Sequence, residues 1–325
     1  MASINKACVI GSGLIGRCWA ALFARAGLEV RLFDIDEAQV TTALDAIRDI
    51  IAELHDNDLL RDQTVDEVLQ RVSGSSNLGD AVGDADYVQE CVPEVLDIKR
   101  KVFEQLDEVV KDSCILASST SCIAPSKFTH DLKHSANCIV AHPVNPPHYI
   151  PVVEVVPAPW TSELTIETTR AFQLRLGQAP VVLRKEVNGF IINRLQYALL
   201  MEAWRLVEDG VATPQDVDTA VSQGLGLRWS FMGPFETIDL NAPGGVVDYC
   251  NRYGDTISAV CREQEDTRAM KGTATAATVH AAMRQDVPED QLKSGARRAW
   301  RDRRLAALAV HKHKQAQVEQ AVDDK

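Results

Sequence analysis

Residues 7–16, ACVIGSGLIG, decide the fold. The first four are apolar and predict a short buried strand, and the glycines that follow are spaced as G-x-G-x-x-G. An amphipathic helical pattern covers 17–26, and a second apolar run, 29–33, ends at Asp34. A strand, a glycine turn, a helix and a second strand together form one βαβ unit of a parallel sheet.

In this setting the glycine pattern predicts a dinucleotide site. Gly11 permits the tight turn, Gly13 lets a pyrophosphate approach the backbone, and Gly16 allows the helix to pack on the strands. Asp34 would accept hydrogen bonds from the adenosine ribose hydroxyls, and its carboxylate would repel a 2′-phosphate, so NAD is favoured over NADP. The alternative is a glycine turn with a purely structural role.

The pattern of apolar runs divides the chain into two domains. Short apolar runs alternate with helical patterns as far as about residue 185, which predicts a Rossmann-type, doubly wound α/β domain over residues 1–187. A long helical pattern then begins at Gly189 and ends at Gly210, and no convincing strand follows. We therefore predict a mostly helical C-terminal domain over residues 188–325.

The composition excludes several classes of protein. With 46% hydrophobic and 25% charged residues, the 325-residue chain is typical of a soluble globular protein. Its formal net charge of −12 disfavours binding to nucleic acid or to a membrane surface. The eight cysteines form no C-x-x-C pair, which predicts free thiols rather than disulfides or a metal site. No apolar run approaches the ~20 residues that span a bilayer, and no signal sequence precedes the first strand, so we expect a cytoplasmic protein.

One segment departs from the acidic total. Residues 293–314 hold eight Lys or Arg and a single acid, Asp302. Trp300, Leu305 and Leu308 recur among the arginines, as they would on a helix that packs by one face. A dimer contact, attraction of anionic ligands and simple solvation all remain open for this segment, and we favour solvation.

A second group of polar residues lies further along the chain. His142 follows an apolar run and opens the motif H-P-V-N-P-P, and Glu154 interrupts the apolar run V-V-E-V-V twelve residues later. A carboxylate in a buried strand is costly unless it is paired, and the proline-rich turn can bring His142 beside it. A glutamate partner would fix the imidazole tautomer and raise its basicity, which suits general acid–base catalysis. The alternative is a hydrogen-bonded core histidine and an edge-strand glutamate.

Two further polar features complete this set. The run S-S-T-S, residues 118–121, follows a predicted strand and therefore lies at the edge of the sheet where such folds bind ligands. Its hydroxyls can hold a substrate oxygen, or can serve only as turn and cap groups. Asn193 stands in the first turns of an apolar helix, where it can meet a ligand, cap the helix or face solvent.

Taken together, these motifs resemble one family. G-S-G-L-I-G, E-C-V-P-E-V-L-D-I-K, S-S-T-S and N-G-F-I-I-N-R, with the spacing from H-x-x-N-P to Glu154, resemble the L-3-hydroxyacyl-CoA dehydrogenase family. Three longer stretches are similar to the branch of that family that includes lambda-crystallin and L-gulonate 3-dehydrogenase. They are IVAHPVNPPHYIPVVEVVP, NRLQYALLMEAWRLVEDG and GLGLRWSFMGPFETIDLNA. The likeness extends to about Trp300.

The resemblance implies roles for individual residues. His142 would be the catalytic base and Glu154 its carboxylate partner. Ser121 and Asn193 would hold the reacting oxygen, and Asn145 would also contact the substrate. Besides the three glycines, the positions that match the family's NAD contacts are Leu14, Ile15, Asp34, Glu94 and Lys99. The resemblance also implies a second domain that forms a homodimer.

The implied reaction is NAD-dependent oxidation of the C3 hydroxyl of a small 3-hydroxy acid, with L-gulonate as the leading substrate and 3-dehydro-L-gulonate as its product. One departure from acyl-CoA members favours a free acid: residues 224–234, GLGLRWSFMGP, contain an insertion that brings Arg228. A guanidinium can bind a carboxylate through two hydrogen bonds, although Arg228 can equally be a solvated or interface residue. L-carnitine and 3-hydroxyacyl-CoA are alternative substrates. A non-catalytic, crystallin-like NAD(H)-binding protein is the alternative from another class.

Overall fold

The computed structural model describes residues 4–323, which form two compact units. The first unit extends to Arg194 and includes the chain again from Ala299. The second unit is Leu195–Arg298. The first contains the sheet, and the second is helical.

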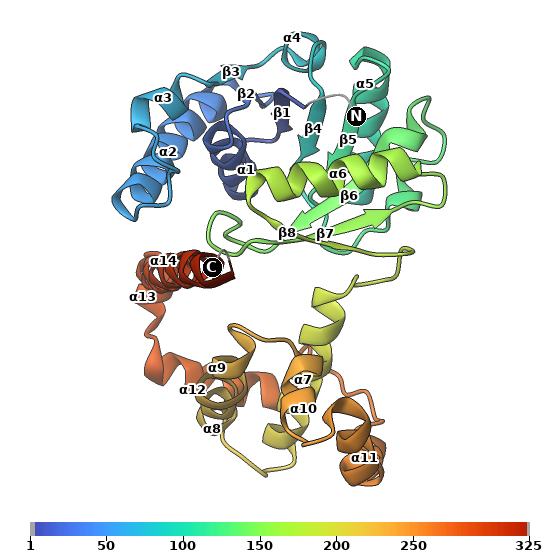
Figure 1. Ribbon diagram of the computed structural model, residues 1–325, viewed down its shortest axis with the longest axis vertical. Coiled ribbons are helices and arrows are strands. Elements are labelled where there is room, and N and C mark those ends of the chain that lie inside the picture. The colour runs from blue at the N-terminus through green and yellow to red at the C-terminus, as the bar shows by residue number, and fades with distance from the viewer. Residues whose placement is uncertain (1–3, 324–325) are drawn as a thin grey trace. The chain divides into compact units, whose positions relative to one another are not determined.

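The first unit is built on one eight-stranded sheet (Figure 1). The strand order is β3-β2-β1-β4-β5-β6-β7-β8, and every neighbouring pair is parallel except β6 and β7. The strands are β1 (Lys6–Ile10), β2 (Glu29–Phe33), β3 (Val72–Ser75), β4 (Tyr87–Glu90), β5 (Ile115–Ser118), β6 (Cys138–Pro143), β7 (Val152–Pro157) and β8 (Ala179–Val182). The predicted Rossmann-type fold is confirmed.

Helices cover both faces of this sheet, so the inner strands such as β4, β5 and β6 are buried on two sides, whereas the edge strands β3 and β8 are partly exposed. The helices are α1 (Leu14–Arg25), α2 (Glu37–Asp56), α3 (Val65–Leu69), α4 (Leu78–Val82), α5 (Leu96–Val109) and α6 (Glu163–Leu176), with short 3-10 turns at Pro125–Lys127 and Ser135–Asn137. Side chains of α1, α2 and α6 form the core on one face, and side chains of α4 and α5 form it on the other. A sheet covered in this way explains why the strands read as continuous apolar runs rather than as alternating ones.

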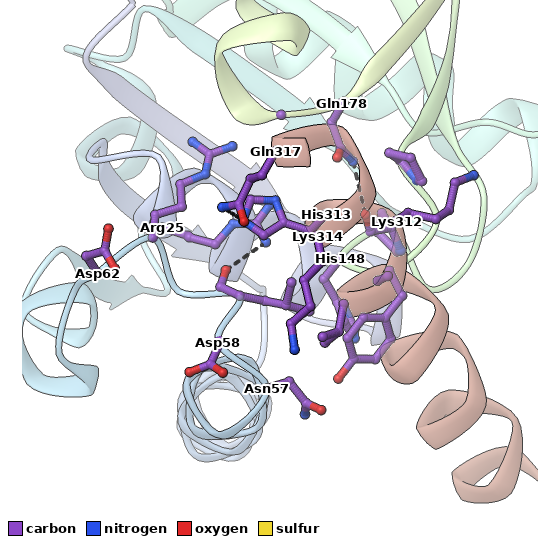
Figure 2. Close-up of a pocket in the computed structure, with 18 residues that line it drawn as sticks. Arg25, Asn57, Asp58, Asp62, His148, Gln178, Lys312, His313, Lys314 and Gln317 are labelled. Carbon is purple, nitrogen blue, oxygen red and sulfur yellow. Dashed lines mark hydrogen bonds between the residues drawn. The ribbon is translucent and has the colours of Figure 1, made fainter. Parts of the chain in front are cut away.

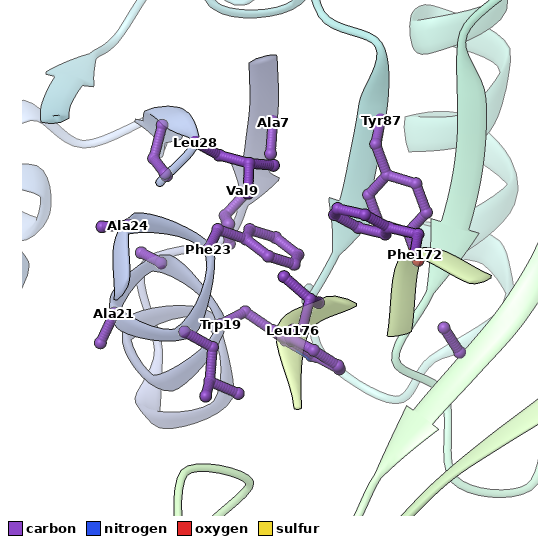
Figure 3. Packing of buried hydrophobic residues seen from close by; sticks show 14 of the residues in the cluster. Ala7, Val9, Trp19, Ala21, Phe23, Ala24, Leu28, Tyr87, Phe172 and Leu176 are labelled. Atoms are coloured by element: carbon purple, nitrogen blue, oxygen red, sulfur yellow. The ribbon is translucent and has the colours of Figure 1, made fainter. Parts of the chain in front are cut away.

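The alternation of side chains along β1 divides the core in two. Ala7 and Val9 belong to one buried cluster and their neighbours Cys8 and Ile10 to the other, as the two-residue period of a strand requires. The first cluster is centred on aromatic rings that contact one another (Figure 3). Its members include Trp19, Phe23, Tyr87 and Phe172, with centroid separations of 4.7 to 5.9 Å.

Two features of the first unit depart from the expectations. The edge strand β3, with the sequence VSGS, carries too few apolar residues to stand out in the sequence. The last helix, α14 (Ala296–Asp323), packs on the first unit from Ala299 onward, whereas the sequence analysis places residues 188–325 in one helical domain. The reason is apolar contact: Ala306 is buried in the core of the first unit, and Leu305 packs against it.

The second unit is helical, as predicted for the C-terminal domain. Its elements are α7 (Ile192–Glu208), which begins in the first unit, α8 (Pro214–Thr219), a π-helical turn (Ala220–Leu225), α9 (Gly226–Trp229), α10 (Pro234–Leu240), α11 (Gly245–Glu263), α12 (Ala274–Asp286) and α13 (Glu289–Lys293). Among the residues described in either unit, no helix combines the length and apolarity needed to cross a bilayer.

Candidate active site

The histidine and glutamate singled out in the sequence lie opposite each other on neighbouring strands. β6 and β7 run antiparallel, and their register pairs His142 directly with Glu154. Nδ1 of His142 lies 2.8 Å from Oε2 of Glu154. The turn formed by residues 144–151 therefore brings the two side chains together.

Glu154 is fully buried, yet each of its contacts stabilises its charge. Its other oxygen, Oε1, accepts hydrogen bonds from the backbone N–H groups of Ile191 (2.7 Å) and Ile192 (2.9 Å), where α7 begins. Burial alone would raise the pKa of this carboxyl, but the His142 contact and the two N–H groups outweigh burial and hold the pKa below its ordinary value. An ionised carboxylate only accepts hydrogen bonds. Nδ1 of His142 therefore carries a proton, and Nε2 is the nitrogen that can take one from a substrate.

The start of α7 also carries Asn193. Its Nδ2 donates to the backbone carbonyl of Ser121, 2.8 Å away, in the loop that follows β5. Because the preceding residue, Ile192, donates to Glu154, a single helix start connects the His142 pair with the Ser121 loop. The four residues to which the sequence assigns catalysis thus come from four separate segments and form one connected group.

Glu94 connects the Ser121 loop to the segment that follows β4. Its Oε1 accepts hydrogen bonds from the Thr120 hydroxyl (2.6 Å) and from the Ser121 N–H (2.9 Å). Its Oε2 lies 3.4 Å from Nζ of Lys99. Burial would raise the pKa of Glu94, but the Thr120 hydrogen bond and the Lys99 charge outweigh it, so the pKa is lowered. An ionised carboxylate therefore orients the backbone next to Ser121.

One residue of this region, Glu90, was missed by the sequence analysis. It ends β4, is fully buried, and holds Nζ of Lys99 at 2.9 and 3.1 Å from its two oxygens. The Ser118 hydroxyl also donates to it. Lys99 is buried as well, so its ammonium is engaged by Glu90 and Glu94, and its contact with NAD stays a prediction. A carboxylate at the end of an apolar strand, in YVQE, was the signal that could have singled out Glu90, although not its partner Lys99.

The three glycines of the glycine loop have different roles: the fold requires two of them, and the third leaves space that fits a dinucleotide. A Cβ on Gly11, whose φ is +101°, would lie 2.9 Å from the carbonyl oxygen of Cys91, and one on Gly16 would lie 2.0 Å from the carbonyl oxygen of Gly11. A Cβ on Gly13 would meet no described atom within 4 Å, so the fold itself does not require a glycine there. Gly13 precedes α1 without a side-chain cap, which leaves the first N–H groups of the helix available to an anion. The pyrophosphate of NAD is such an anion.

Asp34 lies at the end of β2, beside the glycine loop. Its Oδ2 accepts hydrogen bonds from the N–H (2.9 Å) and the hydroxyl (2.6 Å) of Ser12. Burial would raise the pKa of Asp34, but the Ser12 hydrogen bonds outweigh it and lower the pKa. Oδ1 has only a long contact, 3.3 Å, with the N–H of Asp36, so this oxygen can accept from a ribose hydroxyl. At the start of α1, Leu14 is half-exposed and Ile15 is partly buried.

The two remaining predicted substrate residues, Asn145 and Arg228, lie in different units. Asn145 lies three residues after His142, and its Oδ1 is buried without a hydrogen-bond partner among the described residues. Arg228 belongs to the second unit, where it is exposed on α9. Its contact with substrate stays a prediction. Within residues 4–323, no three His, Cys, Asp or Glu side chains are grouped so that they could hold a metal ion.

The chain is similar to known dehydrogenases along most of its length. Residues 6–187 match the family described as 3-hydroxyacyl-CoA dehydrogenase, NAD binding domain, and residues 189–274 match the 3-hydroxyacyl-CoA dehydrogenase C-terminal domain. A lambda-crystallin homolog from Bos taurus is 51% identical over 306 residues, which cover 94% of this chain and 95% of that protein.

Two other relatives have an activity in their names. An L-carnitine dehydrogenase from Pseudomonas sp is 36% identical over 255 residues, which cover 78% of either chain. The crystal structure of 5-formyl-3-hydroxy-2-methylpyridine 4-carboxylic acid 5-dehydrogenase, described as an NAD+-dependent dismutase, matches with a TM-score of 0.78 at 31% identity. That match covers 94% of this chain and 97% of the other, so both units have counterparts.

Proposed function

We propose a substrate for this chain, which belongs to the 3-hydroxyacyl-CoA dehydrogenase family and is an NAD-dependent dehydrogenase that acts on a 3-hydroxy group. The proposed substrate is a small free acid, L-gulonate, which the enzyme oxidises at C3 to 3-dehydro-L-gulonate. The observation that carries the proposed chemistry is the His142–Glu154 pair, with Nδ1 and Oε2 2.8 Å apart. The free-acid substrate is supported by Arg228 in the inserted segment 224–234 and by the sequence likeness of three stretches to the L-gulonate 3-dehydrogenase branch.

The proton is moved by His142. Its Nε2 takes the proton of the C3 hydroxyl, because Nδ1 is already committed to Glu154. Glu154, held ionised by two backbone N–H groups, stabilises the imidazolium that forms. The His142–Glu154 hydrogen bond is already formed in the protein without substrate, so proton transfer requires no rearrangement of this pair.

The remaining residues hold the substrate and the cofactor. Ser121 and Asn193 bind the C3 oxygen as it gains carbonyl character, an electrostatic role that a fixed pair of polar groups can fill. Gly13 and the N-terminal N–H groups of α1 hold the pyrophosphate of NAD, and Asp34 holds its adenosine ribose. NAD, when bound, supplies the hydride acceptor for C3.

A second candidate substrate is L-carnitine. Trp229 (41% exposed) and Phe231 (70% exposed) follow Arg228 in the same segment, and aromatic faces bind a trimethylammonium group. L-carnitine is also a free 3-hydroxy acid, so Arg228 suits its carboxylate equally. A 3-hydroxyacyl-CoA remains the third candidate substrate. A non-catalytic, crystallin-like role is disfavoured because His142 and Glu154 retain their hydrogen bond.

We also propose that the protein works in the cytoplasm as a homodimer. Every cysteine is a free thiol, which agrees with a reducing compartment. The second unit exposes many large apolar side chains, which agrees with a surface that a second copy covers.

One assay tests the proposed substrate. NADH formation would be followed by absorbance with equal concentrations of L-gulonate, L-carnitine, 3-hydroxybutyrate and 3-hydroxybutyryl-CoA. We expect the highest kcat/KM with L-gulonate. A higher value with L-carnitine or with the CoA thioester would replace L-gulonate by that substrate, and no activity with any of the four, in a protein that binds NADH, would favour the non-catalytic role.

A further inference from the structure

A cavity of about 710 Å³ lies in the first unit, apart from all the residues assigned to catalysis or to NAD (Figure 2). Its walls come from five segments: the end of α1, the chain after α2, the loop 144–151, the turn between α6 and β8, and the helix α14. A volume of this size is typical of sites for small molecules.

The side chain that most needs a partner in this cavity is Arg25. It is 8% exposed, and its terminal nitrogens reach only the carbonyl oxygens of Leu59 and Leu176, each at 3.4 Å. Its Nε has no hydrogen-bond partner, and no carboxylate among the described residues forms an ion pair with it. Burial, with the charge of nearby Arg61, lowers the pKa of Arg25 to about 10. A buried cation without a counter-ion destabilises the fold, and a bound anion would offset that cost.

The rest of the lining is also basic on balance. Four basic side chains line the cavity: Arg25, Arg61, Lys312 and Lys314. Only two carboxylates, Asp58 and Asp62, line it as well, so the histidines aside there is an excess of two positive charges.

A neutral donor completes the lining. Nδ1 of His148 is buried without a partner among the described residues. Burial, with the charge of Arg25, lowers the pKa of His148 to about 4, so the ring is neutral at pH 7 and can donate to an anion without adding charge.

We propose that this cavity binds a small phosphate-bearing compound, either inorganic phosphate or a phosphate monoester. Its donors come from three separate elements, α1, the loop 144–151 and α14, rather than from a single one. A tetrahedral dianion accepts hydrogen bonds from several directions, whereas a carboxylate accepts in its own plane. The proposal assigns a role to the end of the basic segment 293–314, because Lys312 and Lys314 belong to it.

Binding is tested on the intact protein saturated with NAD, so that the dinucleotide site is already filled. Inorganic phosphate and glycerol 3-phosphate would be titrated in separate calorimetric experiments, with sodium chloride at matched ionic strength as the blank and citrate as the carboxylate comparison. We expect one saturable site per chain for at least one of the phosphates. Tighter binding of the ester than of inorganic phosphate identifies the ester as the ligand class, and the reverse identifies the free anion.

Two variants and a matched control locate the site. Lys314→Glu should weaken phosphate binding at least about tenfold, because it reverses one charge of the lining. Lys101→Glu, the same change on the exposed surface of α5, should leave it unchanged. Arg25→Gln should abolish binding, and Lys314→Glu keeps the test decisive if the Arg25 variant fails to fold. Absence of saturable binding, equal affinity in the two lysine variants, or tighter binding of citrate than of either phosphate would overturn the proposal.

Discussion

The two units of the molecule differ in how completely each buries its own apolar residues. In the first unit, the rings of Trp19 and Tyr87 are fully buried on one face of the sheet and that of Phe103 on the other. In the second, Ala242 is the one apolar side chain among the described residues that counts as buried. Its large apolar residues are instead exposed, among them Leu195, Tyr197, Val211, Leu227, Phe231, Phe235, Leu240 and Val247. The first unit thus has a core of its own, whereas the second leaves its large apolar side chains on its surface, as an interaction surface does.

The two units also differ in the functional residues that they contain. The residues to which we assign proton transfer and NAD binding all belong to the first unit, and of the predicted site residues only Arg228 belongs to the second. Substitution of one of these residues of the first unit should therefore impair catalysis or NAD binding, whereas substitution of Arg228 or of the exposed apolar residues of the second unit should change substrate recognition or assembly. The predictions that follow test this division.

The largest effect is expected from His142→Gln. The amide cannot accept the hydroxyl proton, so kcat should fall by about 10³-fold or more, while the affinity for NADH and the oligomeric state stay unchanged. The rate of NADH formation measures kcat, and fluorescence titration with NADH measures the affinity for the cofactor. A variant that keeps more than about a tenth of the activity would remove His142 from its catalytic role.

A matched histidine makes this result specific. His130 is exposed and contacts Asp131 and Trp160, away from the His142–Glu154 pair. His130→Gln should retain nearly full activity. Equal losses in the two variants would mean that the assay reports general damage to the fold.

A smaller effect is expected from Arg228→Met, which tests whether the second unit recognises the substrate. Arg228→Met removes a guanidinium that we assign to the substrate carboxylate, so KM for that acid should rise about tenfold to a hundredfold while KM for NAD stays constant. Arg262→Met changes another exposed arginine of the second unit, on α11, and should alter neither constant. Equal changes in both KM values would contradict the assignment of Arg228.

Assembly provides the third test. Phe235 is 78% exposed on α10, and Phe235→Glu would place a charge on the apolar surface that we assign to the dimer contact. The dissociation constant of the dimer, measured by analytical ultracentrifugation, should rise at least about tenfold. Gln291→Glu adds the same charge on exposed α13 and should have no effect. If both variants behave as the wild type, another surface forms the contact or the protein is a monomer.

The contrast also explains what the sequence could predict. The inner strands of the first unit could be predicted because a sheet covered on both faces requires continuous apolar runs, and the glycine turn could be predicted from its G-x-G-x-x-G spacing. Glu154 stood out because it interrupts such a run, and the structure pairs it with His142. These signals are local, since each depends on a few adjacent residues.

The features that were missed depend on contacts between distant segments. The N–H groups of Ile191 and Ile192 that hold Glu154, and the ion pair of Glu90 with Lys99, exist only once the sheet has formed. The packing of α14 on the first unit involves residues more than a hundred positions apart in the chain. No single-sequence pattern encodes such pairings.

The smallest effect concerns acid stability, and Glu154 determines its sign. The folded state holds the pKa of this carboxyl below its ordinary value of 4.5. The ionised form is therefore bound more favourably in the folded chain than in the unfolded one. The stability that Glu154 contributes is complete above pH 4.5 and is lost as the pH falls through the lowered pKa of the folded state.

Glu154→Gln removes this titration from the first unit. At neutral pH the variant should lose about 1 kcal/mol or more of unfolding free energy, because the amide replaces a charge-assisted acceptor for His142 and for two backbone N–H groups. As the pH is lowered below 4.5, the difference from the wild type should shrink, since the wild type then loses the same stabilisation. Urea unfolding between neutral and acid pH measures both free energies, and Glu167→Gln, an exposed change on α6, should follow the wild type throughout. A difference that stays constant with pH would mean that the pKa of Glu154 is the same in the folded and the unfolded chain. A difference that grows as the pH falls would mean that the folded protein holds Glu154 protonated, as a neutral hydrogen bond rather than as the ion pair its contacts indicate.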